Sequence, residues 1–410
     1  MELGFAINDE ANQLIADLIV DSMTGQWRVF HTPDHIFRVG SGGDAIEIIS
    51  ALFHDTVYVQ IDDGVSAGVS QYISPYISAS NDGISITADH HLEKDSVFRL
   101  CLMTFGFEIG QPLNPMAGQN EFLSALFAAI VLEKVLPLPV LAQVISGIEA
   151  TIPFRSGDQL GSSASECLYF KLKNVNEAFG FGWHEHDIEE IIKRGVRLAN
   201  RDIAGFASMS PALFLDDTWK LIPETHHQLR QADHCEMKVY REALQKMAAF
   251  LSALQPENVI SRYQNEPSDE EYARLILLVK RNLLIANSYL DMKLLSIAVI
   301  EALFVQFSMQ ASTNILTVDL HKSDSISGDP QNIALTETDR MVLALLEEGR
   351  TRDLACDKRN SPVAIFILRT MNQEVSRNLL SQAHLFFLGE LSAEGFLKDC
   401  PSKLINACIS

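Results

Sequence analysis

Residues 30–35 read Phe-His-Thr-Pro-Asp-His, and residues 51–55 read Ala-Leu-Phe-His-Asp. Thr32 followed by Pro33 is typical of a helix start, with a hydroxyl group at the cap and proline in the first turn. The next helix is expected to begin at Asp44 and to continue to Tyr58. The two stretches therefore predict successive helices that carry histidines and an aspartate.

Most of the remaining chain has the apolar periodicity of helices. A one-sided apolar stripe marks Asp9–Thr24, and Thr336–Asp339 is typical of a capped helix start. Further helical patterns cover Glu121–Leu136, Val140–Ala150, Ala164–Glu177, His186–Phe206, Met237–Leu254 and Asp269–Met309. We therefore predict a mainly α protein.

One segment departs from this pattern. Between Ile61 and Asn120 the chain is rich in Gly, Ser and Pro, and the period-two runs Gly83–Thr87 and Val97–Phe107 favour strands. A disordered loop is the less favoured alternative, because the segment keeps many aromatic and branched residues. We interpret residues 62–119 as a small strand-containing insert in the helical body, or as a lid that closes over a substrate.

The expected domain organisation follows from these patterns. Residues 1–61 and 120–232 form a first helical domain around the insert, and residues 233–410 form a second, all-helical domain. The polar stretches Gln231–Cys235 and Thr313–Asn332 are candidate boundaries. The second domain has no chemical motif, so helix packing is its simplest role, and dimerisation or sensing is the functional alternative.

Composition limits the partners. The chain has 410 residues and a net charge of −21, with 53 acidic residues against 32 lysines and arginines. This balance disfavours nucleic-acid polymers and anionic membrane surfaces, which need clustered cations. We expect no membrane span, because the most apolar segments contain charged residues such as Glu133 and Glu301. Six cysteines without CxxC spacing, and no signal-like start, favour a reduced, cytoplasmic protein.

The histidines have the spacing of metal ligands. His31 and His35 can face one side of a helix, and His54-Asp55 emerges from an apolar helix. The 3-4-3-4 spacing of residues 188, 191, 195, 198 and 202 places Asp202 on the inward face of the later helix. An ionised carboxylate at such a place needs a partner. A divalent metal held with His35 and His54-Asp55 would provide it.

A structural reading competes with the metal site. A single His-Asp pair is weak evidence, since His186-Asp187 also occurs at an expected helix start. An inward aspartate such as Asp202 is often only a satisfied structural carboxylate. The combination of His-x-x-x-His, a His-Asp pair after an apolar helix and a distant inward aspartate nevertheless favours a metal site.

These residues resemble the HD superfamily of metal-dependent phosphohydrolases. The closest likeness is to the branch with an aromatic-His-x-x-x-His motif (30–35), "ALFHD-x-x-Y" (Ala51–Tyr58) and "NE-x-x-SA" (Asn120–Ala125). The likeness covers roughly Ala11–Phe206. It implies an HD-domain helical bundle that acts as a hydrolase, either a phosphohydrolase or a phosphodiesterase, on a nucleotide or another small phosphoester.

The resemblance also implies residue roles. His35, His54, Asp55 and Asp202 would hold a divalent metal (Mn, Mg, Fe, Ni or Zn), which activates the attacking water. Asp55 would also be catalytic, and His31 would be the general acid that protonates the leaving group. Residues implied to contact the substrate are Arg38, Glu121, Glu149, Arg155 and Arg201.

The chain departs from the family in two ways. Residues 148–155 contain no histidine for a second metal, so a single ion is expected, with Glu149 as a possible substitute ligand. The Glu-Asp pair of alarmone hydrolases is replaced by Thr56-Val57. The alternatives are a non-catalytic module that senses a nucleotide or metal and signals through the second domain, and a di-iron oxygenase. A homodimer fits either reading.

Overall fold

Helices form nearly all the regular structure of the computed structural model, which describes residues 4, 8–80, 83–157, 161–230, 236–307, 335–349 and 361–409. This confirms the predicted mainly α class. The chain divides into two units, one of Met1–Ala204 with Gln255–Ile276 and one of Gly205–Leu254 with Leu277–Ser410. The expected boundary stretches Gln231–Cys235 and Thr313–Asn332 lie outside the described residues.

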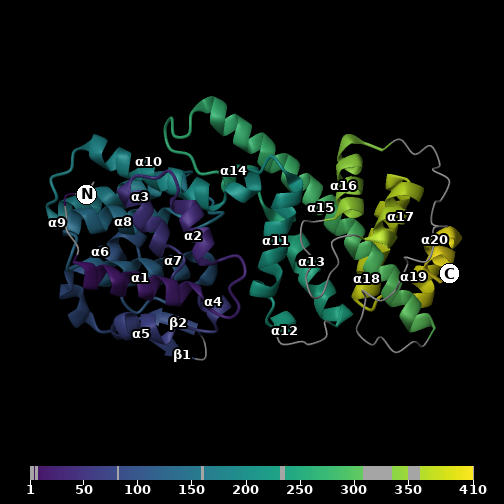
Figure 1. Ribbon diagram of the computed structural model, residues 1–410, viewed down its shortest axis with the longest axis horizontal. Coiled ribbons are helices and arrows are strands. Elements are labelled where there is room, and N and C mark those ends of the chain that lie inside the picture. Colours follow the sequence, from purple (N-terminus) through teal and green to yellow (C-terminus); the bar gives the residue numbers. More distant parts are fainter. Residues whose placement is uncertain are drawn as a thin grey trace. The chain divides into compact units, whose positions relative to one another are not determined.

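The first unit contains the motifs identified above (Figure 1). Its helices are α1 (Asp9–Met23), α2 (Pro33–Gly40), α3 (Ala45–Phe53), α4 (Val59–Asp62), α5 (Ala67–Ile73), α6 (Ser96–Phe105), α7 (Gln119–Leu132), α8 (Leu138–Ala150), α9 (Ala164–Phe179), α10 (Glu185–Asp202) and α14 (Pro256–Val259). Its strands are β1 (Ile77–Ser80) and β2 (Gly83–Ile86).

Helix α8 packs against α3, α7 and α10 and so determines where the ends of those helices lie. Close contact is possible because small residues stand at the crossings. A Cβ atom on Gly147 would lie 2.5 Å from Ser50 Oγ of α3, and one on Gly195 of α10 would lie 2.8 Å from Ala150 Cβ. The C-terminal ends of α3 and α10 carry His54 and Asp202.

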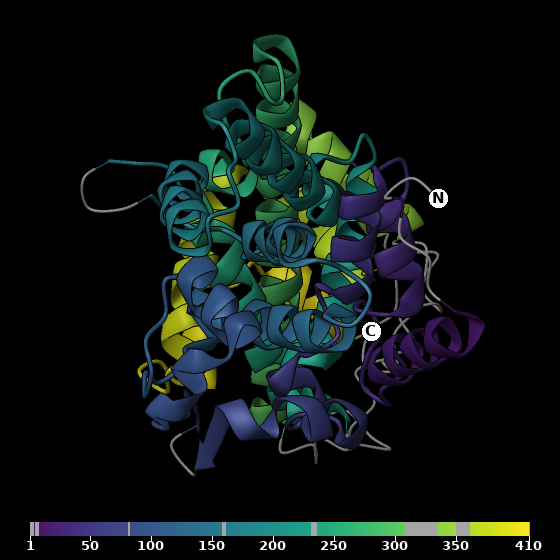
Figure 2. The same ribbon diagram turned by 90° about the vertical axis from the view of Figure 1, so that its left-hand side faces the viewer.

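The strand-containing segment is partly a hairpin and largely part of the helical core. β1 and β2 pair antiparallel, from Ile77 opposite Ile86 to Ser80 opposite Gly83, and lie at the lower edge of the unit (Figure 2). The prediction of a strand over Val97–Phe107 is wrong, because α6 occupies it, with the Asp95 carboxylate accepting from the Val97 and Phe98 amides. Phe98 and Phe105 of α6 are buried in the same core as α7 and α8, so most of 62–119 is built into the body rather than placed over it as a lid.

One predicted helix start is confirmed in position, and one predicted helix end is wrong. Thr32 is the N-cap of α2 and Pro33 follows as expected, but the Thr32 side chain makes no capping hydrogen bond. Helix α3 ends at Phe53 and does not reach Tyr58. Side chains of α7 replace the helical hydrogen bonds there, because Ser124 Oγ accepts from the Val57 amide and Asn120 Oδ1 from the Val59 amide.

Residues 255–276 return to the first unit, although they follow α13 of the second. The Asn200 side chain forms paired hydrogen bonds with the backbone of Ser261, at 2.9 and 2.8 Å. The Tyr169 and Tyr263 rings stack with centroids 6.2 Å apart. The first unit therefore includes a segment that the predicted division at residue 232 assigns to the second domain.

The second unit is helical in its described residues. Its elements are α11 (Pro211–Thr225), α12 (His227–Arg230), α13 (Met237–Ala253), most of α15 (Asp269–Gln306), α16 (Glu337–Glu348), α17 (Pro362–Thr370), α18 (Gln373–Phe387), α19 (Ala393–Asp399) and α20 (Ser402–Ile409). Trp219 packs edge-on against Tyr289, and the predicted cap at Thr336 is confirmed. Within the described chain, α15 alone has the length and apolarity of a membrane span, and 67% of that window is buried, as in a core helix.

Candidate metal centre

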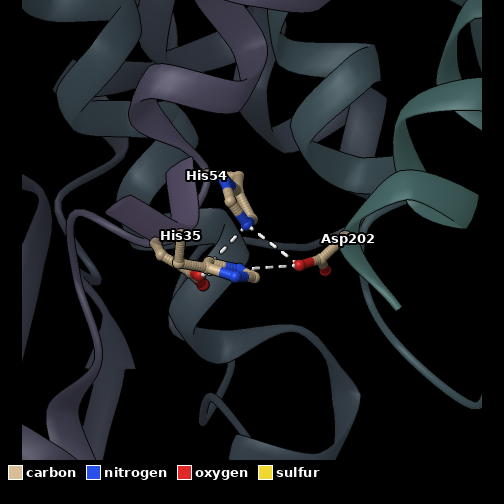
Figure 3. Close-up of side chains that lie close together, drawn as sticks. His35, His54 and Asp202 are labelled. Carbon is tan, nitrogen blue, oxygen red and sulfur yellow. Dashed lines mark hydrogen bonds and ion pairs between the residues drawn. The ribbon is translucent and has the colours of Figure 1, made fainter. Parts of the chain in front are cut away.

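Four side chains that are far apart in the sequence meet at the ends of three helices. His35 comes from α2, His54 caps the C-terminal end of α3 and precedes Asp55, and Asp202 is the last residue of α10. One nitrogen or carboxylate oxygen of each lies within 4.8 Å of the others. Figure 3 shows the two imidazole rings converging on the Asp202 carboxylate. The structure thus brings together all four residues predicted as ligands.

The shortest distances join the imidazole Nε2 atoms to the carboxylates. Asp202 Oδ1 lies 3.0 Å from His35 Nε2 and 3.3 Å from His54 Nε2. Asp55 Oδ2 lies 3.0 Å from His54 Nε2 and 3.3 Å from His35 Nε2. The histidine side chains are at most 2% exposed, whereas those of Asp55 and Asp202 are 16% and 17% exposed. The two aspartates are therefore the more exposed members of the cluster.

The proton on His54 has a fixed position. His54 Nδ1 lies 2.8 Å from the Ala51 carbonyl oxygen, which can only accept a hydrogen bond, so Nδ1 carries a proton. In neutral His54, Nε2 then presents a lone pair to the two carboxylates. This is the orientation of a histidine metal ligand, in which the other ring nitrogen donates to a carbonyl.

One of the two oxygen atoms around that lone pair lacks a hydrogen-bond donor. Asp55 Oδ2 is buried and makes no hydrogen bond of acceptable geometry, although it lies within ion-pair distance of both rings. Neutral His54 would therefore place three electron-rich atoms against one another. A proton on His54 or a cation within the cluster relieves this repulsion.

Electrostatics without a metal favour the proton. Burial lowers the pKa of His54, but the negative charges of Asp55 and Asp202 outweigh it and raise that pKa well above its ordinary value. The pKa of His35 is raised against the same burial. Burial likewise opposes ionisation of Asp202, yet the histidines lower its pKa to about 2. A divalent metal would replace these protons, so metal binding must release protons.

Two arginines that flank the cluster hold its backbone. Arg28 donates from Nη1 to the Asp55 carbonyl oxygen at 2.6 Å and forms an ion pair with Asp62. Arg201 donates from Nε to the Val39 carbonyl oxygen at 2.7 Å and so connects α10 to α2. Arg201 is therefore engaged in positioning the helices, although the sequence interpretation placed it at the substrate.

Glu47 is a buried residue of the site that sequence reasoning missed. Its side chain is 3% exposed and forms ion pairs with Arg197 and Arg201 of α10, at 2.6 and 2.7 Å. The available signal was a single acid in the apolar helix Ala45–Phe53, together with two arginines four residues apart. The pairing fixes α3 to α10, and thereby His54 to Asp202.

His31 lies beside the cluster but outside it. Its ring centroid is 5.8 Å from that of His35 and 4.7 Å from that of Tyr58. Burial raises the pKa of Asp55, but the charges of His54 and then of His31 outweigh burial and help to lower that pKa well below its ordinary value. This position suits the predicted proton donor, whose role stays a prediction.

Of the other residues predicted to contact the substrate, Arg38 lies next to the cluster, whereas Glu149 and Arg155 pair with each other outside it. Arg38 Nη2 lies 3.4 Å from His35 Nδ1, on the ring edge that faces away from the carboxylates. Glu149 is fully buried and outside the four-residue cluster, with ion pairs to Arg155 and Lys171 at 2.8 Å each. Glu149 thus does not replace the missing histidine as a ligand, because both of its carboxylate oxygens are already paired.

Comparisons with protein-family models, with curated proteins and with solved structures found no match.

Proposed function

We propose that this chain is a metal-dependent phosphoric ester hydrolase of the HD type. The observation that carries the proposal is the His54 ring, whose Nδ1 proton is held by the Ala51 carbonyl while Nε2 faces two carboxylate oxygens at 3.0 and 3.3 Å. Two neutral imidazoles and two carboxylates suit Mn, Fe, Ni or Zn, and Mg in a mixed oxygen-rich set. The HD-like order of the motifs supports the same reading.

Each residue would have a distinct role. His35, His54, Asp55 and Asp202 would hold the ion, which supplies charge for the phosphoryl oxygens and an activated water. Arg28 fixes the backbone of Asp55, and Arg201 fixes α10 against α2. His31 lies beside the cluster and would protonate the departing alkoxide.

The substrate would be a small phosphoester such as a nucleotide. The chain carries a net charge of −21, which is unfavourable for a polyanion, whereas a bound cation reverses the potential locally. The carboxylate edge of the cluster, through its exposed fractions of 16% and 17%, would be the side from which the phosphoryl group enters.

The test measures metal content and turnover together. Purified protein is loaded with Mn²⁺, analysed by mass spectrometry of its metals, and assayed with an aryl phosphodiester, an aryl phosphomonoester and a panel of nucleotides. We expect bound metal and hydrolysis in the wild type and neither in Asp55→Ala. Asp44→Asn is the matched control, since Asp44 pairs with Arg194 away from the cluster. Metal without turnover would favour the sensing alternative, and absence of metal binding would contradict the proposed hydrolase.

A further inference from the structure

Glu121 is a half-buried acid with one buried, unpartnered oxygen, and the charges of Asp55 and Asp202 in the candidate metal centre act on it. It lies in the first turn of α7, and its Oε2 atom is buried without a hydrogen-bond partner. Burial is the main reason that its pKa is raised to about 7, and the charges of Asp55 and Asp202 raise it further, whereas Arg155 opposes them. Buried polar groups normally have partners, so an orphaned oxygen at such a place needs an explanation.

The neighbours of Glu121 explain why it stays near the cluster. Asn120 Oδ1 accepts from the Val59 amide at 3.1 Å, and Ser124 Oγ accepts from the Val57 amide at 3.0 Å. Asn120 and Ser124 are four residues apart and lie on one face of α7. They attach this helix to the backbone that directly follows Asp55. The "NE-x-x-SA" stretch thus attaches the first turns of α7, which carry Glu121, to the segment that follows Asp55.

Ligation does not account for the acid. The four atoms that converge within 4.8 Å come from His35, His54, Asp55 and Asp202, and Glu121 is not among them. A hydrogen-bonded ion pair does not account for it either, because Arg155 donates from Nη1 and Nη2 to Glu149, and its buried Nε makes no hydrogen bond to Glu121 Oε2. Glu121 is therefore close enough to interact electrostatically with the ligands, yet its Oε2 remains available as an acceptor.

Resting on the proposed function, we propose that Glu121 is the proton acceptor for the attacking water. One O–H bond of the water breaks, its proton passes to Glu121 Oε2, and the electron pair of that bond stays on the oxygen that bonds to phosphorus. The bond from phosphorus to the leaving oxygen breaks, and His31 protonates that oxygen. Glu121 then returns its proton to solvent and His31 takes one up from solvent, so the net reaction consumes one water and yields an alcohol and a phosphate.

The charge of the centre makes this role depend on the cation. Without a metal, Asp55 and Asp202 disfavour a third negative charge on Glu121. A divalent cation offsets their charge, so Glu121 should ionise when the cation binds. The carboxylate is then in the form that accepts a proton only when the centre is loaded.

The experiment compares Glu121→Gln with Glu133→Gln, an exposed acid at the other end of the same helix. Calorimetric titration with Mn²⁺ at pH 7, in buffers of different ionisation enthalpy, counts the protons released on binding. We expect Glu121→Gln to release about half a proton less than the wild type and Glu133→Gln to match it. In phosphodiester assays, kcat of Glu121→Gln should fall by about 10²–10⁴ with loss of the acidic limb of the pH profile.

The outcomes separate this inference from the proposed function. A wild type that binds Mn²⁺ but hydrolyses no phosphoester contradicts the proposed function, and the catalytic role of Glu121 falls with it. An active wild type whose Glu121→Gln variant keeps its rate and pH profile, or releases as many protons, overturns the role of Glu121 alone. Glu121→Asp keeps the carboxyl and should restore part of the proton release. Circular dichroism checks that each variant is folded.

Discussion

Replacing Asp202 by asparagine should remove most of the stabilisation that a divalent metal gives to the protein. Asparagine has the shape of aspartate but not its charge, and Asp202 Oδ1 is the atom that lies 3.0 Å from His35 Nε2. Even changes to groups behind a metal ligand weaken binding 10–100-fold. Loss of a charged ligand should therefore weaken it by about 100-fold or more.

The expected size of the effect follows from linkage. At a free metal concentration 100 times the wild-type Kd, the bound ion stabilises the wild type by about 2.7 kcal/mol, and a variant with 100-fold weaker binding by about 0.4 kcal/mol. For a unit of roughly 200 residues, such as the first unit, 1 kcal/mol shifts Tm by about 2–4 °C. The wild type should gain about 5–11 °C and Asp202→Asn about 1–2 °C.

The assay is thermal unfolding with EDTA and with Mn²⁺, Ni²⁺ or Zn²⁺. In EDTA, Asp202→Asn should already be less stable by about 2 kcal/mol at pH 6, because the histidines lower the pKa of Asp202 to about 2. The metal-dependent gain is read as a difference within each variant. Asp44→Asn also loses an ion pair, with Arg194, but should keep the full gain. An equal gain in Asp202→Asn and the wild type would refute Asp202 as a ligand.

Three further predictions concern the same helices. In EDTA, the raised pKa values of His35 and His54 contribute stability that is fully present below about pH 6.5 and is lost as the pH rises through the raised values. Melting curves in Mn²⁺ should not show this alkaline loss of stability, because the metal replaces the protons on the two rings. Glu47→Gln should lower the free energy of unfolding in urea by about 2 kcal/mol, because it removes a buried acid that pairs with two arginines. An unchanged urea midpoint would contradict these ion pairs. Gly195→Ala should lower the free energy of unfolding by about 1–3 kcal/mol and weaken Mn²⁺ binding, because the new methyl would lie 2.8 Å from Ala150 Cβ. An unchanged Mn²⁺ affinity in calorimetry would show that α10 can shift without moving Asp202.

The sequence predicted the parts of the site that depend on local periodicity. The 3-4-3-4 spacing before Asp202 correctly placed that acid on the inward face of α10, and His54-Asp55 does follow a buried helix. Both inferences depend only on which positions of a helix its apolar residues occupy. The prediction that the four residues bind metal was a chemical interpretation of that arrangement, and it stays a prediction.

The missed features depend on burial or on contacts between distant segments. Helix α6 is buried around most of its circumference, so Val97–Phe107 shows no polar face that would distinguish it from a strand. Nothing in the local sequence indicates that Ser261 pairs with Asn200 and returns 255–276 to the first unit. Glu149 was taken for a possible ligand because its partner Lys171 comes from α9, beyond the reach of local patterns.

An anomalous diffraction experiment on crystals grown with Mn²⁺ or Zn²⁺ tests the central claim most directly. The proposal predicts one strong anomalous peak at about 2.0–2.3 Å from His35 Nε2, His54 Nε2 and one carboxylate oxygen each of Asp55 and Asp202. A protein that gives no peak among these four side chains at saturating metal, or a peak elsewhere with the two rings still paired to the carboxylates, would contradict the metal centre.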